Sequence, residues 1–344
     1  MEHFNPILGH ETTGQKFITC GEIMLRLTPP NYEKLRMASN FEASYGGSEA
    51  NIALALANLG VDSTFFSVVP NNSLGKSAVR WLRSNDVHCT PMILTEPNET
   101  PSNRLGTYYL ETGYGIRPSK VIYDRKHSAI TEYDFSQVDL DALLEGFDWL
   151  HLSGITPALA PNCRGLIIDM LKVAKKKGLT VSFDGNFRST LWSWEEARDF
   201  CTECLPYVDV LLGIEPYYLW KDDPDHMEEF DETYRNMFDD LREHNPDIKL
   251  VMCEPFVAPV TLPEDEYKAR RTMIEQEIEL MHRIAEDYNA VYVPLLRPFD
   301  EATKVREASY WIWDGIHPTE AGHGLIAHEW VNAVLPSGIL GFTE

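Results

Sequence analysis

From residue 147 onward, segments typical of β-strands alternate with segments typical of α-helices. Strand-like runs such as 148–154 and 179–186 are rich in apolar residues, and the run 163–178 repeats apolar residues at helical spacing. This alternation favours a mostly parallel, doubly wound β-sheet with helices on both faces, which is a three-layer α/β/α fold. In such sheets, ligands bind beyond the carboxyl ends of the strands.

The first part of the chain adds a different element. Residues 17–29 are predicted to form one strand, and 46–60 lead from a glycine pair into a helix. The helical spacing predicts one apolar face, made of Ile52, Ala53, Leu56 and Leu59. The segments "TYYLE" and "SKVIYDR" alternate polar and apolar residues around a glycine-containing turn, which predicts a small β flap, or lid.

The charge is spread unevenly along the chain. The formal net charge is −23, and residues 221–344 hold 27 acidic against 11 basic residues. This acidic balance argues against nucleic acids and anionic membranes as partners. It also predicts two unlike parts, 1–220 and 221–344, with a boundary in the acidic segment 221–232. The strand-like run 208–215 suits either part, so one sheet continuing through both is compatible with the sequence.

The remaining bulk features are those of a cytoplasmic protein. The chain shows no secretory signal and no uninterrupted apolar run of membrane-spanning length. Its six cysteines are scattered, and only Cys201 and Cys204 have a metal-like or redox-like spacing, without a second pair. We therefore expect reduced thiols, no bound metal ion and a cytoplasmic location.

Five segments within the first 220 residues are specific when taken together. They are, in order, "CGEIMLRLTPP", "YGGSEANIALALANLG", "RPSKVIYDRKHSAI", "LHLSGITPAL" and "VSFDGNFRSTLW". This part of the chain resembles the 2-keto-3-deoxygluconate kinases, which are ribokinase-like sugar kinases of the phosphofructokinase-B type. The resemblance implies a keto-sugar acid as the ligand. It also implies a lid through which such kinases often dimerise, so a homodimer is expected.

The residue types suit an anionic sugar acid. Glycine allows the backbone to approach a ligand closely, an amide side chain donates to and accepts from hydroxyls, and arginine holds a carboxylate through two parallel hydrogen bonds. Tyrosine offers a flat face and a hydroxyl. With the resemblance, the predicted sugar-acid-binding residues are Gly46, Gly47, Asn51, Tyr109, Tyr123, Arg125, Asn186 and Arg188.

The second half of such kinases carries a "GAGD"-like loop that opens a helix. Its glycines and the helix N-terminus hold phosphate, and its aspartate takes the proton from the accepting hydroxyl. Residues 221–344 contain no Gly-Asp pair leading into a helix, and no P-loop pattern replaces it. ATP and Mg²⁺, which the resemblance implies, are therefore not expected to bind, and we expect sugar-acid binding without phosphorylation.

Residues 228–344 resemble the C-terminal half of a GDSL/SGNH-type esterase. The closing "DGIHPTEAGH" matches the acid-and-base block of that family, which implies Asp314 as the orienting acid and His317 as the base. The family's nucleophilic "GDS" is absent from the chain. When "LHLSGIT" is lined up with a "GDSIT" strand end, Gly154 takes the nucleophile's place and Ser153 lies one residue early, on the other face of the strand.

Three functional classes therefore stay open. The first is a carbohydrate kinase by descent that is reduced to sugar-acid binding. The second is an SGNH/GDSL-type esterase that uses Asp314 and His317 with Ser153 as an improvised nucleophile. The third is a non-catalytic hybrid chain. Each part lacks the other half of its own active site, which is why the sequence does not decide among them.

Overall fold

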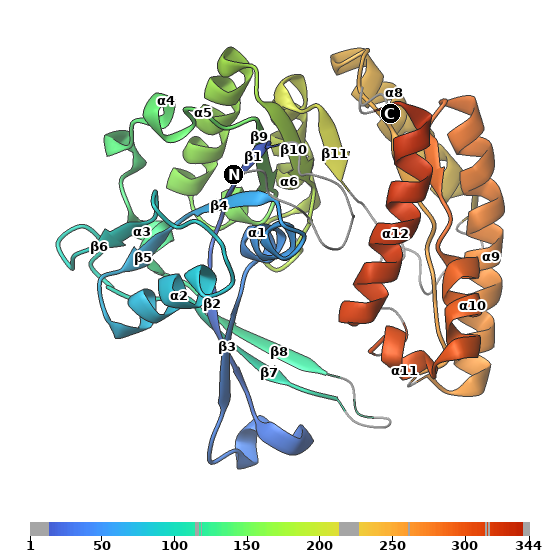
Figure 1. Ribbon diagram of the computed structural model, residues 1–344, viewed down its shortest axis with the longest axis horizontal. Coiled ribbons are helices and arrows are strands. Elements are labelled where there is room, and N and C mark those ends of the chain that lie inside the picture. Colours follow the sequence, from blue (N-terminus) through green and yellow to red (C-terminus); the bar gives the residue numbers. More distant parts are fainter. Residues whose placement is uncertain are drawn as a thin grey trace. The chain divides into compact units, whose positions relative to one another are not determined.

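The computed structural model describes residues 14–113, 117, 119–212, 227–260, 262–313, 315 and 317–339. The chain divides into two compact units, Met1–Ile214 and Glu215–Glu344 (Figure 1). This division lies a few residues before the boundary that the charge distribution suggests. Each unit has its own buried apolar clusters, so each is described by itself.

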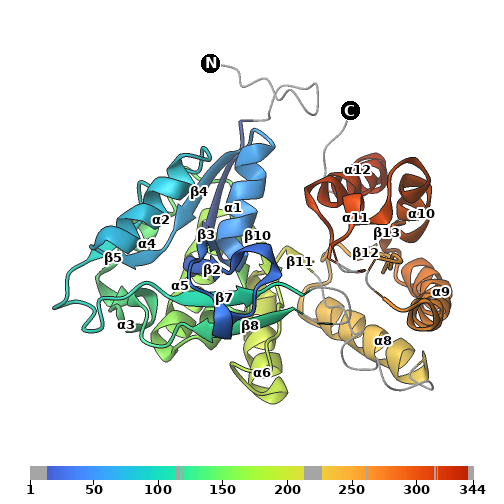
Figure 2. The same ribbon diagram turned by 90° about the horizontal axis from the view of Figure 1, so that it is seen from below.

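The first unit is built on a five-stranded sheet in which every pair of neighbouring strands is parallel. In spatial order its strands are β11 (Val210–Leu212), β10 (Thr180–Asp184), β9 (Trp149–Ser153), β1 (Lys16–Cys20) and β4 (Asp62–Phe66). Helix α1 (Ser48–Asn58) packs on one face, and α5 (Pro161–Lys177) and α6 (Trp194–Cys204) pack on the other (Figures 1 and 2). The predicted parallel α/β fold is confirmed.

Alternation along the central strands decides which face each helix covers. Leu150 and Leu152 of β9 are fully buried in the cluster that α5 and α6 complete, while Ser153 points to the α1 side. Helix α5 starts with a proline at its first position, where a missing N–H costs little, and it ends before Gly178, whose φ is +76°. Helices therefore pack against both faces of the sheet, α1 on one face and α5 and α6 on the other.

A second, four-stranded sheet forms the lid. Its strands are β3 (Glu42–Gly46), β2 (Met24–Thr28), β7 (Thr107–Glu111) and β8 (Lys120–Asp124), in that order (Figure 1). The predicted flap strands are confirmed, but the prediction of one strand over 17–29 is wrong. The chain leaves β1 at Cys20, turns through buried Glu22 and enters the lid sheet as β2. This turn is held in place because Glu22 accepts hydrogen bonds from Arg125 and Ser128, which follow β8.

The other elements of the first unit complete its layers. Its remaining strands form the parallel pair β5 (Val68–Pro70) and β6 (Ile93–Thr95). Its remaining α-helices are α2 (Ser73–Arg83), α3 (Ala129–Glu132) and α4 (Leu140–Leu143). Helix α2 begins at Asn72, whose side chain accepts hydrogen bonds from the backbone N–H groups of Leu74 and Gly75.

The second unit contains the parallel strand pair β12 (Val251–Cys253) and β13 (Val291–Val293). Its helices are α8 (Met227–His244), α9 (Glu264–Asp287), α10 (Leu296–Val305), α11 (Ala308–Trp311) and α12 (Glu320–Ser337). Among the described strands, β12 and β13 pair only with each other.

Two bulk predictions can be compared with the fold. All six cysteines lie in the described segments, and none of them is joined to another by a disulfide there. No helix in the described part of the chain is long and apolar enough to span a lipid bilayer.

Candidate functional site

The carboxyl ends of β1, β9 and β10 meet the start of α1 at one edge of the five-stranded sheet. The Asn186 side chain, just beyond β10, donates to the Ser48 hydroxyl (2.8 Å), and the Ser153 hydroxyl at the end of β9 donates to Glu49 (2.6 Å). These contacts join segments more than 100 residues apart in the sequence. The predicted residues Gly47, Asn51 and Asn186 belong to this edge, where ligands of parallel sheets bind.

The glycine pair is required by close packing. A Cβ atom on Gly47 would lie 2.0 Å from the backbone oxygen of Glu22, and a Cβ atom on Gly46 would lie 2.9 Å from the Tyr108 hydroxyl. Gly47 is extended (φ −177°), so space rather than backbone strain selects glycine there. Asn51 lies in the first turn of α1 with an exposed side chain, and its Oδ1 atom is 3.5 Å from the Gly47 nitrogen.

Three polar residues, Asp184, Asn186 and Arg188, occupy alternate positions at and just beyond the end of β10. Asn186 adopts a left-handed backbone conformation (φ +36°) and donates its backbone N–H to Asp184 (3.0 Å). Burial raises the pKa of the Asp184 carboxyl to about 6, although the Asn186 N–H and the nearby Arg188 act in the opposite direction. The Arg188 side chain is exposed and donates to the Phe187 carbonyl oxygen (3.0 Å).

The lid register places the two predicted tyrosines on opposite sides of the lid. Tyr108 pairs with Tyr123 across β7 and β8, with ring centroids 5.8 Å apart, whereas Tyr109 pairs with Ile122. Successive residues of a strand face opposite sides. Tyr108 and Tyr123 therefore share the side that reaches Gly46, and Tyr109 packs edge-on against Phe41 on the other side. Sequence reasoning missed Tyr108 because nothing in the sequence fixes the strand register.

Arg125 already holds a carboxylate of its own unit. Its Nε donates to Glu22 (2.8 Å) and its Nη2 makes a second contact with the same oxygen, while the Ser128 hydroxyl donates to the other oxygen (2.5 Å). The side chains of Glu22 and Arg125 are only 3% and 12% exposed. This buried ion pair ties the end of β8 to the turn after β1 through Nε and Nη2 of Arg125, and the predicted contact of Arg125 with a ligand carboxylate stays a prediction.

Glu49 is the residue at this edge that sequence reasoning passed over. The predicted apolar face of α1 is only partly right, because Ile52 is 37% exposed whereas Ala50, Ala53 and Glu49 are buried. The Glu49 carboxyl accepts hydrogen bonds from Ser153 (2.6 Å) and Thr156 (2.8 Å). Burial raises the pKa of the Glu49 carboxyl to about 7, although these two hydroxyls lower it. The sequence contains no sign that Glu49 is buried, because a charged residue at the start of an amphipathic helix is expected to face solvent.

Comparison with known families agrees with this geometry. Residues 15–215 match the model of the pfkB family of carbohydrate kinases. The chain belongs to the pfkB family. A solved structure of 2-dehydro-3-deoxygluconokinase from Thermotoga maritima is 39% identical, with a TM-score of 0.60, and the match covers 67% of this chain and 70% of that one. The ribokinase-like fold predicted from the sequence is thereby confirmed.

Curated relatives of the pfkB part have related names. A 2-dehydro-3-deoxygalactonokinase of Haloferax volcanii is 36% identical over 200 residues, which are 58% of this chain and 61% of that protein. A 2-dehydro-3-deoxygluconokinase of Bacillus subtilis is 29% identical over 175 residues, which are 51% of this chain and 52% of that protein. The chain thus spans between about half and three fifths of the length of these relatives.

The remainder of this pfkB chain resembles a different family, as predicted. Residues 217–325 match the GDSL-like lipase/acylhydrolase family. His317 is exposed, its carbonyl oxygen accepts from the Trp313 N–H (2.7 Å), and it lies shortly before α12, as predicted. Asp314 lies outside the described residues, so its predicted place beside His317 stays a prediction.

The geometry argues against Ser153 as an esterase nucleophile. Its side chain is fully buried, and its hydroxyl donates to Glu49 instead of a histidine. The family's nucleophile position falls on Gly154, where a Cβ atom would lie 2.3 Å from the Gly185 carbonyl oxygen. No side chain fits there without moving the backbone. The predicted role of Ser153 is therefore corrected to that of a buried hydrogen-bond donor.

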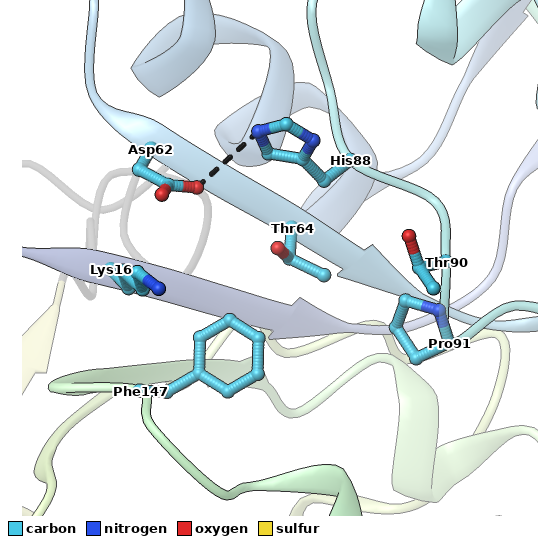
Figure 3. Close-up of a pocket in the computed structure, with 7 residues that line it drawn as sticks. All are labelled: Lys16, Asp62, Thr64, His88, Thr90, Pro91 and Phe147. Carbon is cyan, nitrogen blue, oxygen red and sulfur yellow. Dashed lines mark ion pairs between the residues drawn. The ribbon is translucent and has the colours of Figure 1, made fainter. Parts of the chain in front are cut away.

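A shallow pocket of about 290 Å³ lies at the opposite end of the same sheet (Figure 3). It opens at the amino ends of β1 and β4, and its lining includes Lys16, Asp62 and His88. The His88–Asp62 ion pair there (3.4 Å) joins two well-exposed side chains, which makes it weak. The predicted site residues lie away from this end of the strands.

Proposed function

We propose that the N-terminal unit binds a 2-keto-3-deoxy sugar acid and that the chain does not phosphorylate it. The observation that carries this proposal is the meeting of Asn51, Asn186 and exposed Arg188 at the carboxyl edge of the sheet, opposite the lid side that carries Tyr108 and Tyr123. Amide and hydroxyl groups suit the hydroxyls of a sugar, and an exposed guanidinium suits a carboxylate. The names of the relatives point to the same class of ligand.

We further propose that the second unit does not bind ATP and Mg²⁺. Helix α10 follows β13, where a phosphate-binding helix start would be expected, but the Glu254 carboxylate accepts from its first N–H groups, those of Leu295 (2.8 Å) and Leu296 (2.7 Å). A carboxylate already bound there repels phosphate.

Replacing Arg188 with alanine is expected to weaken sugar-acid binding at least tenfold. A charge-assisted hydrogen bond contributes about 1.5–3 kcal/mol, and about 1.4 kcal/mol is a factor of ten. Isothermal titration calorimetry with 2-keto-3-deoxygluconate measures the dissociation constant directly. The matched control is Arg198→Ala on α6, because Arg198 is an exposed arginine of the same unit that pairs with Asp199.

The ligand series sharpens this test. 2-Keto-3-deoxygluconate should bind the wild-type chain, and 2-deoxyglucose, which has no carboxylate, should bind weakly to the wild type and no more weakly to Arg188→Ala. Equal affinity of the wild type and Arg188→Ala for the sugar acid would contradict the assignment of Arg188. Failure of every sugar acid to bind the wild type would contradict the proposed function.

We further propose that the lid mediates a homodimer. Strand β8 exposes Val121 (42%) and Tyr123 (55%) on the Tyr108 side of the lid and Ile122 (43%) on the other side, and a second lid would cover the Ile122 side. Multi-angle light scattering at micromolar concentration is expected to give the mass of a dimer. Ile122→Glu should give monomers without touching the Tyr108 side of the lid. The control is Val305→Glu, an exposed apolar position of the second unit, and a wild-type monomer would refute the proposal.

A further inference from the structure

Glu49 joins three elements at the candidate site. Its side-chain oxygen Oε1 accepts from the hydroxyls of Ser153 at the end of β9 and Thr156 in the turn that follows. Its backbone oxygen accepts from the Thr19 hydroxyl of β1 (3.0 Å). The residue is only 1% exposed although it lies in the first turn of α1. These contacts fix the start of α1 against the carboxyl edge of the sheet.

The second carboxyl oxygen of Glu49 is enclosed by the backbone. A Cβ atom on Gly21 would lie 2.1 Å from Oε2 of Glu49, so only glycine leaves room for the carboxyl there. Two predicted or contacting residues of the candidate site share the first turn of α1 with Glu49: Ser48 accepts from Asn186, and Asn51 lies two residues after Glu49. Glu49 is thus placed to fix the orientation of Ser48 and Asn51 without contacting the ligand itself.

We propose that Glu49 is a positioning residue for the sugar-acid site, whose carboxyl clamps the first turn of α1 to the ends of β1 and β9 and so holds Ser48 and Asn51 in place. This inference rests on the proposed function, because it concerns the same site. Glu49 itself does not contact the ligand. Loss of the clamp lowers affinity by reducing the fraction of the protein in the binding-competent arrangement.

The clamp depends on pH. The charged and titratable groups around Glu49 are Arg125 beyond β8, Cys20 of β1 and Cys163 of α5. The thiols stay neutral because burial raises the pKa values of Cys20 and Cys163. Arg125 is the cation that favours a charged Glu49 carboxylate, but it is already paired with Glu22, and burial has the larger effect on the pKa of Glu49. A proton on the Glu49 carboxyl therefore favours the closed clamp. Release of the carboxyl returns its pKa toward the ordinary value of 4.5, so the closed clamp is lost as pH rises from about 4.5 to about 7, with little further change above pH 7.

Calorimetric titration with 2-keto-3-deoxygluconate between about pH 5 and pH 7.5 tests the proposal. The pKa of Asp184 is about 6, so Asp184 titrates in the same range and the profile of Glu49→Gln measures its share. Wild-type affinity is expected to fall as pH rises to about 7, by at most about tenfold per pH unit, and then to level off. Glu49→Gln should lack the Glu49 part of this fall, and Glu49→Ala should bind at least about tenfold more weakly than the wild type at about pH 5. The matched control is Glu254→Gln, a buried carboxylate of the second unit, which should keep the wild-type profile.

A second measurement does not need the ligand. Hydrogen exchange of the amides in the first turn of α1, corrected for intrinsic rates, should speed up about tenfold or more between about pH 5 and pH 7 in the wild type. In Glu49→Gln it should stay constant over this range. Unchanged exchange in the wild type, or the same pH profile in both proteins, would overturn the clamp while leaving the proposed function intact. If no sugar acid binds, the proposed function fails, and the exchange data alone decide whether Glu49 is the clamp.

Discussion

Incubating the full chain with ATP, Mg²⁺ and 2-keto-3-deoxygluconate is expected to release no substrate-dependent ADP. Phosphoryl transfer depends on positioning and charge stabilisation by a phosphate-binding loop, a metal ion and a group that takes the hydroxyl proton. Losing one oxyanion-type donor typically costs about 10² to 10³ in rate. In this chain the Gly-Asp motif is absent, and the start of α10 is occupied by Glu254. The combined loss puts turnover below detection.

A coupled ADP-release assay is the measurement, and an intact pfkB kinase in the same mixture is the positive control. The strongly acidic residues 221–344 also repel ATP, so raising the ATP concentration should not rescue turnover. Substrate-dependent release at even about one per second, within the usual range of kinases, would refute the prediction. That result would require a phosphate site in the second unit.

Replacing Arg125 with alanine is expected to lower the free energy of unfolding of the first unit by about 3–5 kcal/mol. Glu22 is 3% exposed, and removing its cationic partner leaves a buried carboxylate with the Ser128 hydroxyl as its remaining side-chain donor. Because the two units have separate cores, hydrogen exchange of β1 and β9 peptides at increasing urea concentration is the suitable measurement. It reports the stability of the first unit alone.

Two variants make this test specific. The double variant Glu22→Gln with Arg125→Met removes both charges and should recover most of the loss, since a neutral pair avoids an uncompensated buried charge. Arg104→Ala breaks the ion pair with Asp124 at the end of the same strand β8, but both partners are more exposed, so the cost should stay below about 1 kcal/mol. Equal effects of Arg125→Ala and Arg104→Ala would show that the Glu22–Arg125 pair is not a buried charge pair in energetic terms.

Periodicity and local motifs carry the parts of this protein that can be predicted from its sequence. The strand–helix alternation predicts the parallel sheet, and the short alternating segments around 107–125 predict the lid. The helical spacing of Tyr234, Met237, Phe238 and Leu241 predicts one apolar face of α8, and all of these residues except the half-buried Met237 are buried. These features are decided by neighbours in the sequence, so a single chain is enough to find them. The same holds for the short sequence motifs that indicate the two family resemblances.

The roles of individual side chains at the candidate site were decided only by the tertiary structure. Whether Tyr108 or Tyr109 faces Gly46 depends on a strand register, and one position of slip exchanges the two faces. Arg125 is taken by Glu22, which lies 103 residues earlier. Sequence spacing gives no account of such a partner.

Glu49 and Gly154 show the same physical limit. Hydrophobic periodicity treats a glutamate as a solvent-facing residue, but hydroxyl donors from β9 and the following turn allow its burial in α1. Gly154 aligns with a nucleophile position, yet the Gly185 carbonyl oxygen fills the space that a side chain would need. The sequence by itself determined the layers and the lid. The tertiary structure decided which polar groups have partners and which can meet a ligand, because those pairings join segments far apart in the chain.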